Sequence, residues 1–159
     1  KIAPDLTLQE LDDVVHIARS RRVDGMIVAN TTLSRPMTLR ETVKAKEQGG
    51  LSGRPLLRLS TRMVAETYVR AEGAFPLIGV GGIDSGGAAL MKIRAGATLI
   101  QLYSSLVYKG LGLVEDIKAA QEMDPLAVEP VDVVGQTDLG EATEVDTTVM
   151  PIIDVGGPT

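Results

Sequence analysis

The chain has 159 residues, of which 44% are hydrophobic and 23% charged, a size and balance typical of a globular domain with its own core. It has no cysteine and one histidine, which excludes disulfides, thiolate metal sites and histidine-cluster metal sites, and we expect no bound metal. A net charge of -5 with three Tyr, one Phe and no Trp lacks the basic and aromatic pattern of nucleic-acid-binding proteins.

The charge is divided unevenly along the chain. Residues 121–159 hold nine Asp and Glu but no Lys or Arg, whereas all 16 basic residues lie within residues 1–120. A composition change of this kind indicates two regions. We therefore expect a folded domain over residues 1–120 and an irregular acidic tail over residues 121–159. The tail contains four prolines and is predicted to be disordered or to hold two short strands, over 145–149 and 152–155.

The first predicted unit is the end of a strand at residues 1–3, followed by a helix. Pro4 ends the strand because it cannot donate a ladder hydrogen bond. Thr7 and Glu10 have the spacing of a capping box at a helix start. Apolar residues then recur at helical spacing at Leu8, Leu11, Val15 and Ala18.

The second unit begins with an apolar run over residues 26–29, typical of a strand buried on both faces. Asn30 and Thr31 follow it directly, where parallel sheets place ligands, and a simple turn is the alternative. The glycine-rich stretch 49–55 predicts either a backbone that approaches a ligand or a flexible loop. A helix is predicted over residues 56–70, with an apolar stripe at Leu56, Leu59, Met63 and Thr67.

The third unit is a strand over residues 75–80 that runs into Gly81 and Gly82, followed by a helix over residues 88–95. Glycines before a helix N-terminus form a phosphate site in many proteins, and a tight turn is the alternative. A dinucleotide fingerprint is a poorer match, because Asp84 stands where its third glycine belongs.

The fourth unit is a strand over residues 98–102, the pair Tyr103 and Ser104, and a helix over residues 106–120 interrupted at Gly110 and Gly112. Four alternating strands and helices predict an α/β fold with a parallel sheet. Phosphate sites of eight-fold barrels often use the loops after the last two strands. The four units are therefore predicted to be the C-terminal half of a TIM (β/α)8 barrel.

Several motifs along residues 1–120 resemble class 2, quinone-linked dihydroorotate dehydrogenases over the C-terminal half of that family. They agree in order and spacing. They are Lys1-Ile2-Ala3-Pro4-Asp5-Leu6, Asp24-Gly25, Asn30-Thr31-Thr32, Gly49 to Leu56, Ser60-Thr61, Ile78 to Ile83, Ala95-Gly96-Ala97 and Gln101-Leu102-Tyr103-Ser104.

The resemblance implies an FMN-binding barrel that oxidises dihydroorotate to orotate in pyrimidine biosynthesis and passes electrons to a quinone. By resemblance, Lys1 reaches the flavin ring, and Asn30 and Thr31 hydrogen-bond dihydroorotate or orotate. The other implied FMN contacts are Gly53, Gly82, Tyr103 and Ser104, of which the last three lie around the phosphate. Ala29 departs from relatives that often carry a threonine contacting FMN here.

The chain also departs from the family pattern because the first half of the barrel is missing from it. The family's catalytic serine, its quinone site and its membrane-contacting helices belong to that half, so no catalytic residue is assigned here. None of Ser34, Ser52, Ser60, Ser85, Ser104 and Ser105 matches the catalytic serine. We expect no turnover by this chain alone. The resemblance implies a peripheral membrane location for the complete enzyme. Without the membrane-contacting helices, we expect a cytoplasmic location.

Three further interpretations stay open. In the first, the chain is a non-catalytic half barrel that binds FMN or another phosphate ligand and self-associates through open sheet edges at Ile2 and Leu99. In the second, it is a fragment without a stable fold. In the third, which is the weaker match, it belongs to another FMN- or phosphate-binding barrel family.

Overall fold

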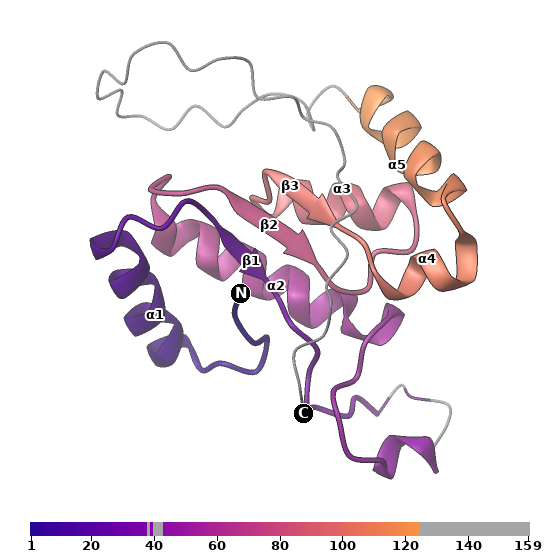
Figure 1. The fold of residues 1–159 in the computed structure, drawn as a ribbon, viewed down its shortest axis with the longest axis horizontal. Helices are drawn as coiled ribbons and strands as arrows, with labels where there is room; N and C mark the ends of the chain where they lie inside the picture. The colour runs from indigo at the N-terminus through magenta and orange to yellow at the C-terminus, as the bar shows by residue number, and fades with distance from the viewer. Residues whose placement is uncertain (38, 40–42, 125–159) are drawn as a thin grey trace.

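The structure, a computed structural model, describes residues 1–37, 39 and 43–124, and within them three strands form one parallel sheet in the order β1-β2-β3. The strands are β1 (Met26–Val28), β2 (Leu77–Val80) and β3 (Leu99–Gln101). Their arrowheads point the same way in Figure 1, so the carboxyl ends of all three meet at one edge of the sheet. This confirms the predicted α/β class and parallel sheet.

The described part of the chain also contains five α-helices and two short 3-10 helices. They are α1 (Leu8–Ser20), η1 (Lys44–Lys46), η2 (Arg54–Leu56), α2 (Leu57–Ala71), α3 (Gly86–Arg94), α4 (Ser104–Lys109) and α5 (Gly112–Glu122). The predicted break in the last helix is confirmed, because Gly110 adopts φ 65° between α4 and α5. Helix α5 ends at Glu122, two residues past the predicted domain boundary. The two strands predicted in the tail lie outside the described residues.

The two faces of the sheet differ in how deeply they are buried. On one face, Met26, Val28 and Leu77 are buried against residues of α1 and α2, including Leu11 and Val64. Because successive side chains of a strand point to opposite faces, the residues between these point to the other face of the sheet. There Ile27, Ile78 and Leu99 stand in register across the three strands and are only partly buried. The helices therefore cover one face of the sheet and leave the other partly open.

The strand end predicted at residues 1–3 is present as a single parallel bridge to β1 rather than as a full strand of the sheet. Ile2 forms a single parallel bridge with Val28, in which the Ile2 N–H donates to the Ile27 carbonyl at 3.0 Å. The Ile2 carbonyl accepts from the Asn30 N–H at 2.8 Å, and the chain turns at Pro4 before a second pair forms. Among the described residues, the sheet edges therefore lie at Ile2 and at β3.

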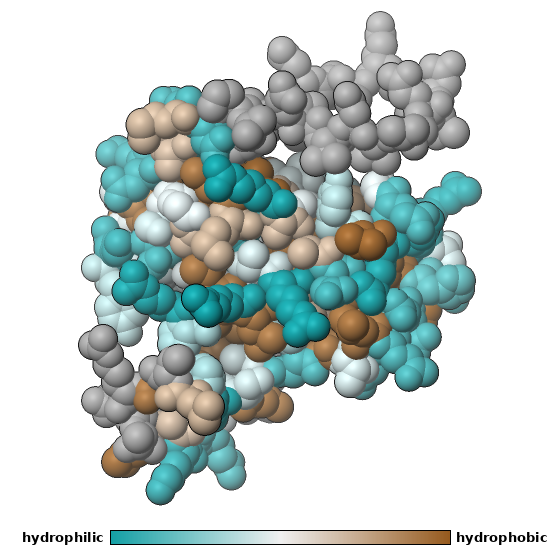
Figure 2. All heavy atoms as spheres, turned by 180° about the vertical axis from the view of Figure 1, so that it is seen from behind, coloured by the Kyte–Doolittle hydropathy of each residue, from teal (hydrophilic) through white to brown (hydrophobic). Residues whose placement is uncertain are grey.

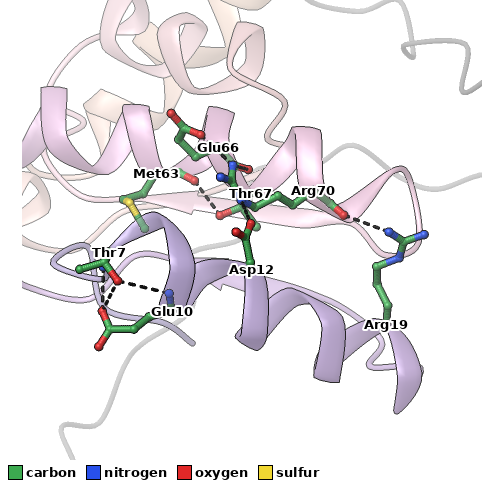
Figure 3. A network of polar contacts seen from close by, with 8 residues as sticks. All are labelled: Thr7, Glu10, Asp12, Arg19, Met63, Glu66, Thr67 and Arg70. Carbon is green, nitrogen blue, oxygen red and sulfur yellow. Dashed lines mark hydrogen bonds and ion pairs between the residues drawn. The ribbon is translucent and has the colours of Figure 1, made fainter.

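Helices α1 and α2 are joined by a network of charged side chains (Figure 3). The Arg70 Nε donates to Asp12 on α1 at 2.5 Å, and its Nη1 donates to Glu66 on its own helix at 2.7 Å. Arg19 on α1 donates in return to the Arg70 carbonyl at 3.2 Å. Because Arg70 is half-buried between the helices, its hydrogen bonds fix how the two helices pack side by side.

The start of α1 confirms the capping box. Thr7 Oγ1 accepts from the Glu10 N–H at 3.2 Å, and the Glu10 carboxylate accepts from the Thr7 N–H at 2.8 Å. The stripe that follows buries Leu11, Val15 and Ala18, while Leu8 in the first turn stays 42% exposed.

We expect Thr7→Ala to lower the free energy of unfolding by about 1 kcal/mol, because the Glu10 N–H in the first turn loses the Thr7 hydroxyl as its hydrogen-bond partner. Urea denaturation followed by circular dichroism measures this change. Thr98→Ala is the control, since Thr98 is an exposed threonine outside any helix. Equal losses in the two variants would contradict a capping role for Thr7.

The view from behind shows hydrophilic side chains over much of that face, with apolar ones gathered in smaller patches between them (Figure 2). In the described part of the chain, no helix combines the length and the apolar character that crossing a membrane requires.

Candidate functional site

A cavity of about 120 Å³ opens at the carboxyl ends of the three strands. All seven residues predicted to bind cofactor or substrate line it, although they are spread over more than a hundred positions. They are Lys1, Asn30, Thr31, Gly53, Gly82, Tyr103 and Ser104. The structure thus brings the predicted residues together at one place, because the loops that follow the strands start at the same edge of the sheet.

The charge of this lining is one-sided. Lys1 is the only charged residue among the described residues that line the cavity, and Asp and Glu are absent from that set. The described residues also contain no group of three or more His, Cys, Asp or Glu side chains able to hold a metal ion. The lining is therefore suited to an anionic ligand rather than to a cation.

The loop after β1 places Asn30 and Thr31 at the cavity. The Asn30 Oδ1 accepts from the Thr31 N–H at 2.8 Å, which holds the side chain against its own backbone. The next residue, Thr32, pairs with Leu51 through two backbone hydrogen bonds of 3.1 and 2.7 Å. Gly50 lies so close that an added Cβ would sit 1.9 Å from Thr31 Oγ1. The glycine-rich loop therefore packs directly against Thr31.

The Asp5 carboxylate holds the loop after β1 through hydrogen bonds. It accepts from the hydroxyls of Thr32 at 2.5 Å and Ser34 at 2.7 Å, and from the Leu33 N–H at 3.0 Å. Burial raises the pKa of Asp5, but the hydrogen bonds to Thr32, Ser34 and the backbone outweigh it and bring the pKa below its ordinary value. Asp5 thus stays ionised and keeps the loop after β1 in one conformation.

The second wall of the cavity comes from the glycine-rich loop and α4. Gly53 adopts φ 76°, and the space where its Cβ would stand is open. One residue earlier, Ser52 Oγ accepts from Ser104 Oγ at 3.1 Å and so joins this loop to the start of α4. A backbone in the left-handed region beside open space is what a closely approaching ligand requires.

The third wall is the turn of Gly81 and Gly82 after β2. Both adopt positive φ, at 102° and 77°. An added Cβ on Gly82 would lie 2.5 Å from the backbone nitrogen of Leu57 at the start of α2. At the rim, the Arg54 guanidinium pairs with Asp84 at 3.0 Å and ties η2 to this turn. The turn is therefore pressed against α2 and leaves its other side to the cavity.

Our sequence-based prediction missed Gln101, which lines the cavity from β3. It is 3% exposed, and its Oε1 has no hydrogen-bond partner in the structure. A buried amide oxygen without a partner is costly, and a donor on a bound ligand would satisfy it. The available signal was a glutamine within an otherwise apolar strand.

Together these groups form a set of hydroxyls, backbone N–H groups and one cation, without a carboxylate. Such sets bind phosphate and other anions. The cavity is smaller than the roughly 300 Å³ at which pockets for drug-sized ligands begin. It therefore has room for only part of a larger anionic ligand.

Comparison with known proteins places this site in a family. The family model described as "Dihydroorotate dehydrogenase" matches residues 1–123. A curated relative named "Dihydroorotate dehydrogenase (quinone)", from Rhodopseudomonas palustris strain BisA53, is 89% identical over 118 residues. Another with the same name, from Bradyrhizobium sp. strain BTAi1, is 86% identical over 119 residues. These matches cover 74% and 75% of this chain but 32% and 33% of the relatives.

Solved structures agree with the sequence comparison. The crystal structure of DHODH from Eimeria tenella in complex with ferulenol superposes with a TM-score of 0.71 at 42% identity, over 74% of this chain and 31% of that one. The ligand-free DHODH of the same organism gives the same TM-score and identity and is covered over 32% of its length. The chain spans about a third of the length of the relatives it matches. Because the family model covers most of the chain at its folded end, the chain belongs to the dihydroorotate dehydrogenase family.

Proposed function

We propose that residues 1–123 form C-terminal strand–helix units of an eight-stranded TIM barrel and hold the phosphate end of FMN. One observation supports the proposal. The seven residues predicted by resemblance line a single cavity, and among the described residues of its lining there is one cationic side chain and no carboxylate. The partly open sheet face with Ile27, Ile78 and Leu99 is the side that would face the barrel interior. Helix α5 ends at Glu122, next to the last residue that the family model matches.

In this proposal the residues divide into two groups. Gly53, Gly82, Tyr103 and Ser104 hold the FMN, and Lys1 stabilises negative charge on its reduced ring. Asn30 and Thr31 donate and accept hydrogen bonds with dihydroorotate or orotate. FMN supplies the hydride-accepting chemistry when it is bound. Ala29 lines the cavity without a hydroxyl, so any contact it makes with the cofactor is through its backbone.

The complete enzyme oxidises dihydroorotate to orotate and reduces a quinone. The catalytic base, the quinone site and the contact with the membrane surface belong to the first half of the barrel, which these residues do not include. The 159 residues alone are thus not expected to turn over dihydroorotate, because they supply the cofactor cradle and part of the substrate site but no base.

The test uses a grafted enzyme, in which residues 1–123 replace the homologous segment of the 89%-identical Rhodopseudomonas palustris relative. We expect it to retain a visible flavin absorption band after desalting and to oxidise dihydroorotate with a soluble quinone. Lys1→Met in the grafted enzyme should lower kcat by about 100-fold or more while the flavin band stays, because a cation aimed at developing charge is removed. A grafted enzyme without flavin, prepared beside a flavin-loaded parent, would overturn the proposal.

A second candidate function is ligand binding by this chain on its own. The sheet edges at Ile2 and β3 favour it, since two copies can cover each other's open edges. Analytical ultracentrifugation of the 159-residue chain, with and without FMN, tests this. A stable monomer that gives no flavin band after desalting excludes this candidate without affecting the grafted enzyme.

A further inference from the structure

Lys92 is a fully buried lysine in the core behind the glycine turn. It lies on α3 with 0% exposure, and its Nζ donates to Ser60 Oγ on α2 at 2.5 Å. Its aliphatic part packs on β2 at Gly79, where an added Cβ would lie 3.2 Å from Lys92 Cβ and 2.9 Å from Ala97 Cβ. Gly79 therefore makes the room that lets this lysine cross beneath the sheet.

No carboxylate of the described residues pairs with Lys92. Helix α3 packs on α2, α5, β2 and β3, and these two strands carry no charged residue. The other charged residues of the three helices are all at least partly exposed. They are Arg58, Arg62, Glu66, Arg70, Arg94, Glu115, Asp116, Lys118 and Glu122.

An unpaired buried ammonium is costly. Burial lowers the pKa of Lys92 to about 7. Replacing such a group by an apolar one of similar shape is often neutral or stabilising. Stability of the core therefore does not account for a lysine at this position.

Ser60 connects this lysine to the cavity. Its hydroxyl lies 3.0 Å from the carbonyl oxygen of Gly81 and 2.9 Å from that of Leu56. A serine hydroxyl carries one hydrogen, whereas a lysine ammonium carries only donors. With Lys92 charged, Ser60 Oγ must accept from Nζ, so its own hydrogen is directed to the carbonyls. A neutral Lys92 amine can instead accept that hydrogen and withdraw it from Gly81.

The Gly81 carbonyl sets the direction of the next N–H. The peptide between Gly81 and Gly82 is trans, so the Gly81 C=O and the Gly82 N–H point in opposite directions. Ser60 lies on the core side of the turn and does not line the cavity, while both glycines do. With the carbonyl held toward Ser60, the Gly82 N–H points toward the cavity.

We propose that Lys92 and Ser60 are positioning residues for the phosphate group: the Lys92 ammonium orients the Ser60 hydroxyl, which holds the Gly81–Gly82 peptide with its N–H toward the ligand. The buried positive charge then lies behind the donor that meets the anion. This inference rests on the proposed function, because it assigns the phosphate of a flavin nucleotide to the glycine turn.

The test compares FMN with riboflavin, which lacks the phosphate, in the grafted enzyme. Dissociation constants come from quenching of flavin fluorescence. Lys92→Met keeps the length of the side chain and removes the charge. We expect it to weaken FMN binding by about tenfold or more, the range for a hydrogen bond to a charged group, and to leave riboflavin binding within about twofold. Lys118→Met, at an exposed lysine of α5, is the matched control and should change neither constant.

The outcomes separate the two levels of the proposal. An unsubstituted grafted enzyme that binds FMN no more tightly than riboflavin overturns the proposed function itself. A normal preference for FMN that Lys92→Met leaves intact, or equal losses for the two flavins, overturns the positioning role.

A second measurement needs no variant. Between pH 7 and 9 the FMN phosphate stays doubly ionised, since its second pKa is about 6. The preference of the unsubstituted grafted enzyme for FMN over riboflavin should fall across this range as Lys92 loses its proton. A preference that stays constant with pH overturns the proposal even if Lys92→Met fails to fold.

Discussion

Replacing Gly82 with alanine is expected to lower the free energy of unfolding of this chain by about 3 kcal/mol or more. The new Cβ would lie 2.5 Å from Leu57 N and 2.6 Å from Leu57 Cα, which are backbone atoms at the start of α2 and cannot rotate away. The residue also adopts φ 77°, which costs alanine further strain. Urea denaturation of the 159-residue chain, followed by circular dichroism, measures the loss.

The same substitution should remove flavin from the grafted enzyme, because the turn must move away from α2 to accept a methyl group. Gly87→Ala is the matched control. Gly87 lies in the first turn of α3 with ordinary φ, and the space around its Cβ position is open. We expect this control to be neutral or to stabilise by up to about 1 kcal/mol, since alanine favours the helix. A Gly82→Ala chain that unfolds at the parent's urea midpoint would contradict the close packing against α2.

The second large effect is a dependence of stability on pH that comes from Lys92. Its pKa is about 7 in the folded chain, against 10.5 for an ordinary lysine. Below pH 7 both states hold the proton, so the full cost of the buried charge is present. Between pH 7 and 10.5 the unfolded chain holds a proton that the folded chain lacks, and the free energy of unfolding therefore rises with pH. Above 10.5 nothing further is gained.

We expect the ligand-free chain to gain about 2 kcal/mol of stability between pH 7 and 9, since each pH unit inside this window contributes up to about 1.4 kcal/mol. Urea midpoints at pH 7, 8 and 9 measure the rise. Lys92→Met should remove most of it, whereas Lys118→Met should keep it. Parallel pH profiles for the parent and Lys92→Met would show that Lys92 does not titrate in this range.

The helices were largely predictable because their signals are local. Thr7 and Glu10 lie three residues apart, and Gly110 interrupts a run that is otherwise helical, so neighbouring residues carry the information. The predicted start of α3 is two residues late. In the structure Ser85 caps the helix by accepting from the Ala88 N–H at 3.2 Å. The prediction left out Gly86 and Gly87 because glycine is a poor helix former.

The buried faces were harder to predict where packing overrides residue type. Periodicity assigned Leu59 to the core of α2, whereas the structure buries Ser60 completely and leaves Leu59 only partly covered. Ser60 is accommodated because its hydroxyl contacts the carbonyls of Leu56 and Gly81 and the amine of Lys92. The space for Lys92 depends on small residues at Gly79 and Ala97, which only the folded chain brings beside α3.

The candidate site shows the same division. Polar residues after each buried strand indicated where ligands bind, but spacing alone could not show that Lys1 and Tyr103 share one cavity. The family resemblance supplied that grouping. It did not supply Gln101, whose role depends on a hydrogen bond that the amide oxygen lacks in the folded chain.

The order of the strands has a consequence for hydrogen exchange. Among the described strands, β2 is the one with a partner on both sides, whereas β3 has one strand partner and β1 meets only a single bridge at Ile2 on its outer side. Its amide hydrogens should therefore exchange most slowly with solvent, at rates set by global opening rather than by fraying. The glycine turn emerges directly from this strand. The Gly81–Gly82 turn is therefore attached to the strand that we expect to open last.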